Sequence, residues 1–194
     1  PIKENQILTG ALEKTNESYS VAKIAGIQMI EAFNKQYKTK YVCLMPCNLF
    51  GPNDSYDLQN SHFLPALIKK IFDASKKSKN KVAKLWGTGK PLREVLYVDE
   101  VAEACIFYLK KKNISPLINI GSSTEMTIKN YANFIKNKID PIIKIKFDNN
   151  LKLDGVKRKK LDVRLANKYG WNSKMNFSEA IDKTIQAFKI SKKH

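Results

Sequence analysis

The sequence contains little arginine for a chain so rich in positive charge. Its 194 residues carry a formal net charge of +17, yet Arg93, Arg158 and Arg164 are its only arginines, and lysines supply the remaining basic residues. Specific recognition of bases and phosphates relies on the planar fork of arginine. The lysines are also scattered, with the densest groups at 76–81 and 110–112. The composition therefore favours a solvated surface over a nucleic-acid interface, which stays open as the alternative.

Cysteine and long apolar runs are scarce as well. Cys43, Cys47 and Cys105 are odd in number and lack the spacing of a metal site. Such usage is typical of a reducing compartment. No apolar run approaches the roughly 18 residues of a membrane span, and the first residues, PIKENQ, lack the apolar segment of a signal peptide. We therefore expect a cytoplasmic protein without a membrane or metal partner.

Glycine is too sparse to form a dinucleotide-binding turn. The eight glycines are Gly10, Gly26, Gly51, Gly87, Gly89, Gly121, Gly155 and Gly170, and no group of them follows a strand in the spacing of such a turn. The sequence also begins at Pro1 rather than at methionine. Both features lead us to expect an upstream part of the protein outside this sequence. What is present, with 43% hydrophobic residues, suffices for one good core.

Helix and strand patterns alternate along the chain. Apolar residues at helical spacing predict helices at 16–37, 62–77, 99–112, 127–139, 164–171 and 178–190. Apolar or alternating runs predict strands at 41–45, 81–87, 93–98, 116–123 (with a polar loop at its end) and 142–147, whereas 46–54 is predicted to be a loop. The run YVCLM at 41–45 is typical of a strand buried on both faces. The class is therefore α/β with a mostly parallel sheet.

Tyr19 and Lys23 lie four positions apart in the first predicted helix. That spacing places both side chains on one helical face. A neighbouring ammonium favours the ionised phenol, so such a pair can give a proton to an oxygen as a hydride arrives at its carbon. In a lysine-rich chain the same spacing arises by chance. On spacing alone, a surface pair is the better interpretation.

The motifs around this pair change the interpretation. TNESYSVAKIAG, MPCNLFGPND, NSHFLPAL and WGTGKPLREVLYVD follow one another in the chain. In this order they resemble the extended short-chain dehydrogenase/reductases that act on nucleotide sugars, and the resemblance extends from about residue 1 to residue 188. It implies the C-terminal part of a Rossmann-type parallel sheet domain at 1–50 and 98–125. It also implies a smaller α/β substrate-binding domain at 51–97 and 126–194.

An activity is implied by the same resemblance. The most similar family members use NADP, in its reduced form NADPH, to epimerise C3 and C5 and to reduce C4 of a GDP-linked 4-keto-6-deoxy sugar. They work as homodimers, with the helix that matches the Tyr19 helix near the interface. A sibling nucleotide-sugar epimerase or dehydratase is the nearest alternative, because it shares Tyr19 and Lys23 without requiring His62.

The resemblance assigns the reacting positions. Tyr19 matches the acid that protonates the C4 oxygen, and Lys23 matches the lysine that holds the nicotinamide ribose. Pro46 and Asn48 match positions close to the cofactor, and Asn48 is also near the sugar. His62 matches the general acid of the epimerisation, a task that suits imidazole. Taken alone, His62 is better interpreted as a cap of the helix that follows it.

Further positions are implied for substrate binding, namely Lys70, Trp86, Arg93, Asp154 and Lys159, in addition to Asn48 and His62. Arg93 lies beside an apolar strand, where an arginine needs an anionic partner such as a diphosphate. Pairing with Glu94 or Asp99 is the structural alternative. Trp86 is expected to line the nucleotide pocket or else to pack in the core. Lys70 stands where the family more often has arginine, so the charge is kept and the fork is lost.

Two expectations remain, one about the position of Lys159 and one about the residues upstream of Pro1. Lys159 lies in the run KRKK at 157–160, so its match can shift by a residue or two. Cys47 is expected to pack, because the family's catalytic cysteine, like its serine and its glycine-rich turn, lies upstream of Pro1. We therefore expect residues 1–194 alone to bind NADPH poorly and to be inactive. A sheet without its central strands also favours association through its edges.

Overall fold

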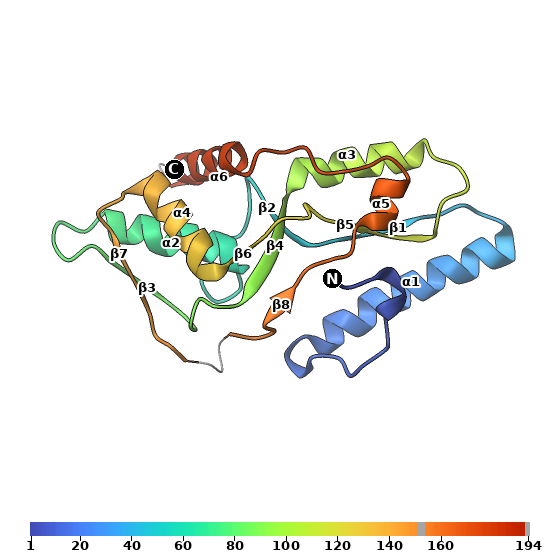
Figure 1. Ribbon diagram of the computed structural model, residues 1–194, viewed down its shortest axis with the longest axis horizontal. Coiled ribbons are helices and arrows are strands. Elements are labelled where there is room, and N and C mark those ends of the chain that lie inside the picture. Colours follow the sequence, from blue (N-terminus) through green and yellow to red (C-terminus); the bar gives the residue numbers. More distant parts are fainter. Residues whose placement is uncertain (151–153, 193–194) are drawn as a thin grey trace.

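The structure is a computed structural model that describes residues 1–150 and 154–192 (Figure 1). Its helices are η1 Glu4–Gln6, η2 Lys14–Asn16, α1 Glu17–Tyr37, α2 Phe63–Ser75, α3 Val98–Leu109, α4 Ile128–Ile139, α5 Arg164–Lys168 and α6 Phe177–Ser191. Its strands are β1 Cys43–Pro46, β2 Asn48–Phe50, β3 Val82–Leu85, β4 Leu92–Tyr97, β5 Leu117–Ile120, β6 Glu125–Thr127, β7 Lys144–Phe147 and β8 Arg158–Lys159. None of the described helices is long and apolar enough to cross a membrane.

Short strands form three separate sheets. β1 pairs with β5, β3 pairs with β7, and β2, β4 and β6 form the third sheet, in which β8 also pairs with β4. All of these pairs are parallel except β4–β6, which is antiparallel. The predicted α/β class with mostly parallel pairing is confirmed. Strand β4 pairs with β2 through residues 95–97 and with β8 through residues 92–93, so it is the strand around which the others gather.

The predicted helices all form, with ends that differ by a few residues, whereas three strands were not predicted. Part of the loop expected at 46–54 is wrong, because Asn48–Phe50 form β2. Strands β6 and β8 were missed as well. These strands contain only two or three residues, too few for a periodic pattern. They form because β4 supplies N–H and C=O groups that need partners, a condition that only the folded chain creates.

The segment YVCLM is less buried than its apolar run predicts. β1 pairs with β5 on one side, and no described strand pairs with its other side. Its residues 42–45 are half-buried and Tyr41 is exposed, so the expectation of a strand buried on both faces is wrong. Helix α1 likewise has no buried residue and lies along one side of the molecule (Figure 1). Asn16 precedes α1, but its side chain makes no capping hydrogen bond.

Apolar side chains pack into two cores, and β4 contributes to both. The first core joins α2, α4 and α6 and includes Leu64, Ile68, Tyr131, Ile181 and Phe188. The second joins α3, β5 and α5 and includes Ala104, Ile118, Ile120, Ala166 and Trp171. Alternate residues of β4 face opposite sides: Val95 and Tyr97 enter the first core and Leu96 the second. Packing on both faces therefore fixes β4 firmly. The division into two domains at the boundaries given above stays a prediction.

Candidate active site

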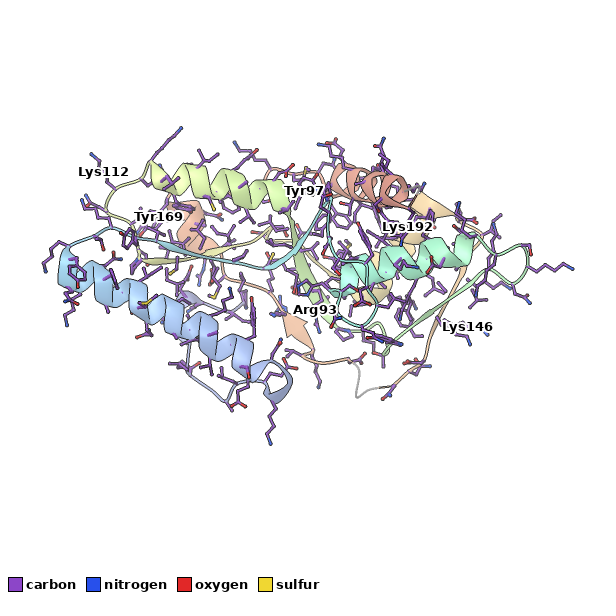
Figure 2. All side chains as sticks on the ribbon, turned by 180° about the vertical axis from the view of Figure 1, so that it is seen from behind. Arg93, Tyr97, Lys112, Lys146, Tyr169 and Lys192 are labelled. Carbon is purple, nitrogen blue, oxygen red and sulfur yellow. The ribbon has the colours of Figure 1, made fainter. Side chains whose placement is uncertain are left out.

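Strand β4 brings three of the predicted site residues together. Asn48 in β2 is the register partner of Val95. Lys159 in β8 is the register partner of Arg93. The side-chain amide of Asn48 also donates a hydrogen bond of 2.8 Å to the backbone carbonyl of Glu94. Figure 2 shows Arg93 near the middle of the molecule, beside β8. Residues that are far apart in the sequence thus meet along one strand.

The Arg93 guanidinium is held by backbone carbonyls. Nη1 donates to Leu92 O at 2.9 Å and to Val156 O at 2.6 Å, and Nη2 donates to Asp154 O at 3.1 Å. Burial lowers the pKa of Arg93, while the nearby charges of Asp154 and Glu13 act in the opposite direction. A guanidinium has more N–H groups than these carbonyls accept, so donors remain for an anion.

Neither carboxylate considered as an alternative partner pairs with Arg93. The described ion pairs do not include Glu94 or Asp99. The side chain of Glu94 instead points to the other face of β4, because successive residues of a strand alternate. The interpretation of Arg93 as one half of an ion pair with Glu94 or Asp99 is therefore wrong.

Asp154 supports the loop that holds Arg93. Its carboxylate accepts hydrogen bonds from the Thr88 hydroxyl at 2.6 Å and from the Thr88 backbone N–H at 2.7 Å. These donors hold the pKa of Asp154 below its usual range. Gly87 has a φ of +74°, and a Cβ there would lie 2.4 Å from Asp154 Oδ1. The turn therefore requires glycine, and the Asp154 carboxylate, predicted to bind substrate, makes hydrogen bonds within the protein.

Glu94 is a residue of this region that sequence reasoning did not assign to the site. Its side chain is fully buried, and its carboxylate accepts from Ser123 N at 2.8 Å and from Leu161 N at 2.9 Å. Burial raises the pKa of Glu94, and these two N–H donors oppose that shift. Glu94 ties β4 to the segments that follow β5 and β8. The sequence feature that could have pointed to this role is a glutamate inside the largely apolar strand REVLYV.

Trp86 and Lys70 contact each other at the surface. Trp86 follows β3 and is 58% exposed, so the alternative of packing in the core is wrong. The Nζ atom of Lys70, on α2, lies 3.6 Å from the centroid of the Trp86 ring, a cation–π contact. Burial lowers the pKa of Lys70, and Asp148 nearby opposes that shift. The structure therefore brings two predicted nucleotide-binding residues together on one surface.

Tyr19 and Lys23 also contact each other. The Nζ atom of Lys23 lies 5.4 Å from the centroid of the Tyr19 ring, and Tyr19 is 63% exposed. Helix α1 contacts η2, the short turn that precedes it. The charge of Glu13, just before α1, acts on Arg93, which places the start of this helix near the Arg93 region.

His62 stands immediately before α2. It occupies the N-cap position, yet its side chain makes no capping hydrogen bond, so the interpretation of His62 as a helix cap is wrong. The imidazole is exposed. Burial raises the pKa of Asp54, and the neighbouring His62 opposes that shift, so the two side chains lie near each other. The His62 side chain therefore does not cap α2 and is open to solvent.

Cys47 behaves as a packing residue, as the sequence predicts. It packs against the second core as a partly buried side chain. Burial raises the pKa of its thiol far above the usual range, and the charge of Glu94 adds to that shift. A thiol that stays protonated is a poor base.

Parallel strands linked by helices define this molecule as part of a Rossmann-type α/β fold. Residues 1–121 match the family model described as the NAD dependent epimerase/dehydratase family. The chain belongs to this family.

Known proteins of this family are similar over nearly the whole chain. It is 39% identical over 186 residues to putative GDP-L-fucose synthase 2 of Arabidopsis thaliana, covering 96% of this chain and 56% of that protein. It is 36% identical over 197 residues to GDP-L-fucose synthase of Escherichia coli K12, covering 97% and 61%. The solved structure of a GDP-L-fucose synthetase from Naegleria fowleri bound to NADP has a TM-score of 0.85 at 25% identity, covering 100% and 60%. The chain therefore spans between 56% and 61% of the length of these relatives.

Proposed function

We propose that the protein containing this chain converts GDP-4-keto-6-deoxy-D-mannose to GDP-L-fucose, by epimerisation at C3 and C5 and reduction at C4 with NADPH. The observation that carries the proposal is that Arg93 in β4 and Lys159 in β8 are register partners in neighbouring strands. Two adjacent cations suit the diphosphate of a nucleotide sugar, because charge-assisted hydrogen bonds to phosphate are the strongest available. The names of the similar proteins supply the identity of the sugar.

In this proposal Arg93 and Lys159 orient the substrate by its diphosphate. Arg93 is fixed by carbonyls of the 154–156 segment, so its remaining N–H groups are already directed before substrate arrives. Trp86, with Lys70 on its face, offers an exposed ring on which the guanine base stacks.

Tyr19 and Lys23 deliver the proton of the reduction. Bound NADPH supplies the hydride for C4. The Tyr19 hydroxyl gives its proton to the C4 oxygen, and the Lys23 ammonium stabilises the phenolate that remains. Both side chains are on one face of α1 and in contact, which this step requires.

His62 returns a proton during the epimerisation. Inversion next to a ketone needs one group to remove a proton and another to deliver one to the opposite face. The exposed His62 imidazole, free of a capping bond, is available as the delivering acid.

The residues of this chain fit one end of NADP. Tyr19 and Lys23 offer donors to the nicotinamide ribose, and Pro46 ends β1 at the carboxyl edge of the parallel pair β1–β5, where Rossmann-type sheets bind their ligands. A glycine-rich turn that would hold the pyrophosphate is not among the glycines of this sequence. We therefore expect residues 1–194 alone to bind NADPH weakly and to show no turnover.

The test is a product analysis with the full-length protein. GDP-4-keto-6-deoxy-D-mannose and NADPH are supplied, and the product is separated by chromatography against a GDP-L-fucose standard. Formation of GDP-L-fucose with equimolar loss of NADPH supports the proposal. A reduced GDP-sugar whose C3 and C5 are unchanged would instead identify a sibling reductase, and no loss of NADPH would overturn the proposal.

We also propose that the full-length protein is a homodimer with α1 near its interface. Helix α1 carries exposed apolar side chains, among them Val21, Met29 and Phe33. Such a row needs a covering surface. Light scattering after size exclusion measures the mass, and a monomer at micromolar concentration would contradict this part of the proposal.

A further inference from the structure

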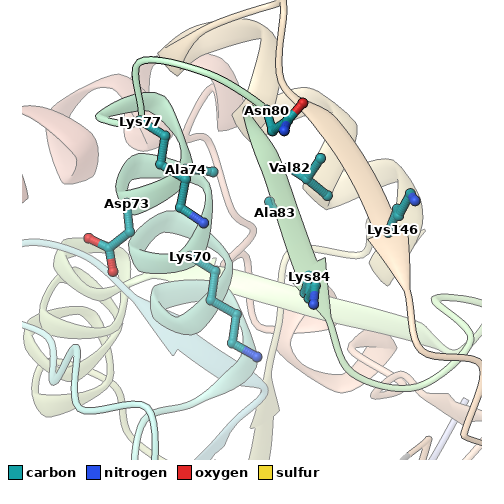
Figure 3. A pocket seen from close by; sticks show the side chains of 9 residues that line it. All are labelled: Lys70, Asp73, Ala74, Lys77, Asn80, Val82, Ala83, Lys84 and Lys146. Atoms are coloured by element: carbon teal, nitrogen blue, oxygen red, sulfur yellow. The ribbon is translucent and has the colours of Figure 1, made fainter.

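A hollow lined by lysines lies between α2 and β3, apart from the Arg93 and Lys159 pair (Figure 3). Its volume is about 490 Å³. Lys70 comes from α2, Lys77 from the turn after it, Lys84 from β3 and Lys146 from β7, so the four lysines that line it come from three parts of the chain. The hollow is therefore a feature of the tertiary structure and not of a lysine-rich segment.

Two of these lysines stand directly opposite each other. Lys84 and Lys146 are register partners in the parallel pair β3–β7, and both are exposed. Like charges in directly opposite positions of neighbouring strands destabilise the pairing. A bound anion removes that repulsion by bridging the two ammonium groups.

The positive charge of the hollow is not balanced by carboxylates. Asp73 is the acidic residue in the lining, and it forms an ion pair with Lys69. Asp148 lies near Lys70, and its carboxylate accepts a hydrogen bond from Gly87 N. Among the described ion pairs, none includes Lys77, Lys84 or Lys146. An anion entering the hollow would therefore meet several cations without first displacing a partner.

We propose that this hollow is a second anion site, which binds a small phosphate-bearing anion with at least two negative charges, such as pyrophosphate or a nucleoside triphosphate. The site is distinct from the Arg93 and Lys159 pair, and it goes beyond the proposed activity. Lys70 connects the two regions, because its amine already lies on the exposed Trp86 ring. An anion that draws Lys70 into the hollow would uncover that ring.

Isothermal titration calorimetry with the full-length protein tests the proposal, using pyrophosphate and ATP as separate probes. All proteins carry Arg93→Lys and Lys159→Gln, so that both cations of the proposed diphosphate contact are weakened in every titration. The triple variant Lys77→Gln, Lys84→Gln, Lys146→Gln is compared with a control of equal charge loss, Lys35→Gln, Lys110→Gln, Lys112→Gln. We expect saturable binding that weakens about tenfold or more in the hollow variant and less than about twofold in the control.

The outcomes of the titrations distinguish recognition of the phosphate groups alone from recognition of a whole nucleotide. Equal affinities for pyrophosphate and ATP identify the phosphates alone as the recognised group, and tighter binding of ATP identifies a nucleotide; either supports the site. Equal weakening in both triple variants would mean general charge attraction and would overturn it. Binding of duplex DNA that is lost in the hollow variant, without saturable binding of either probe, would make the hollow part of a nucleic-acid interface and would also overturn it.

Discussion

Arg93 and Lys159 are register partners in the parallel pair of β4 and β8, and this pairing sets two cations side by side. Two cations repel each other, so it is the backbone hydrogen bonds between β4 and β8 that hold them in this arrangement. Arg93 is held further by the carbonyls of Val156 and Asp154, which lie just before β8. The same short segment therefore orients one cation and supplies the other.

Replacing Arg93 by lysine keeps the charge and removes the planar fork. We expect the KM for the GDP-sugar to rise roughly tenfold to a hundredfold, because the paired hydrogen bonds to phosphate are lost. Steady-state kinetics with the full-length protein measures the change. Arg164→Lys is the matched control, since Arg164 pairs with Asp162 and is expected to leave KM unchanged.

Arg93 and Lys159 are expected to act on the same group of the substrate. The double variant Arg93→Lys, Lys159→Gln should then lose less binding free energy than the sum of the single variants, by more than about 0.5 kcal/mol. The comparison of KM values in a double-mutant cycle measures this difference. Strict additivity would show that the two cations contact separate groups.

Replacing Tyr19 by phenylalanine removes the proposed proton donor while leaving the ring on Lys23. We expect kcat for the reduction to fall by roughly 10²-fold to 10⁴-fold, as is usual for loss of a positioned acid. Thermal unfolding should stay unchanged, because Tyr19 is 63% exposed. Tyr37→Phe, on the same helix and also exposed, is the control; an equal loss of activity there would point to a general effect on α1.

Replacing His62 by glutamine should separate the two halves of the reaction. We expect epimerisation to slow by roughly 10²-fold or more, because the delivering acid is lost, while hydride transfer to a substrate that needs no inversion is retained. Deuterium incorporation at C3 and C5 in heavy water measures the first step and NADPH consumption the second. Stability should be unaffected, since His62 makes no capping bond to α2. Parallel loss of both steps would contradict the separate role.

Asp154 makes the stability of the protein depend on pH. Its folded pKa is lowered by the Thr88 donors, so its contribution is present above the pKa of an unfolded carboxyl, about 3.9, and is lost as pH falls through the lower folded value. Because Asp154 is only partly buried and solvent screens its charge, Asp154→Asn should destabilise the protein by about 0.5 kcal/mol at pH ~7 and by less below pH ~4. Denaturant unfolding at both pH values measures this. Asp99→Asn, at the exposed first turn of α3, is the control, and a pH-independent difference would contradict the role of the Thr88 hydrogen bonds.

The helices were predictable because their signal is local. Apolar spacing over 63–75 or 177–191 depends only on residues a few positions apart, and both segments are helical as expected. The strands of two and three residues were not predictable, since β2, β6 and β8 exist only where β4 is present to pair with them. The burial of β1 was not predictable either, because it depends on how many strands flank β1 and not on its own apolar run.

The sequence by itself determined the α/β class, the order of the helices, and the motifs that contain Tyr19, Lys23, His62 and Arg93. It left several roles open between structure and chemistry. Only the tertiary structure decided that His62 caps no helix, that Trp86 is exposed with Lys70 on its face, and that Arg93 lies beside Lys159. These are relations between residues far apart in the chain, set by strand register and packing, and no local pattern encodes them.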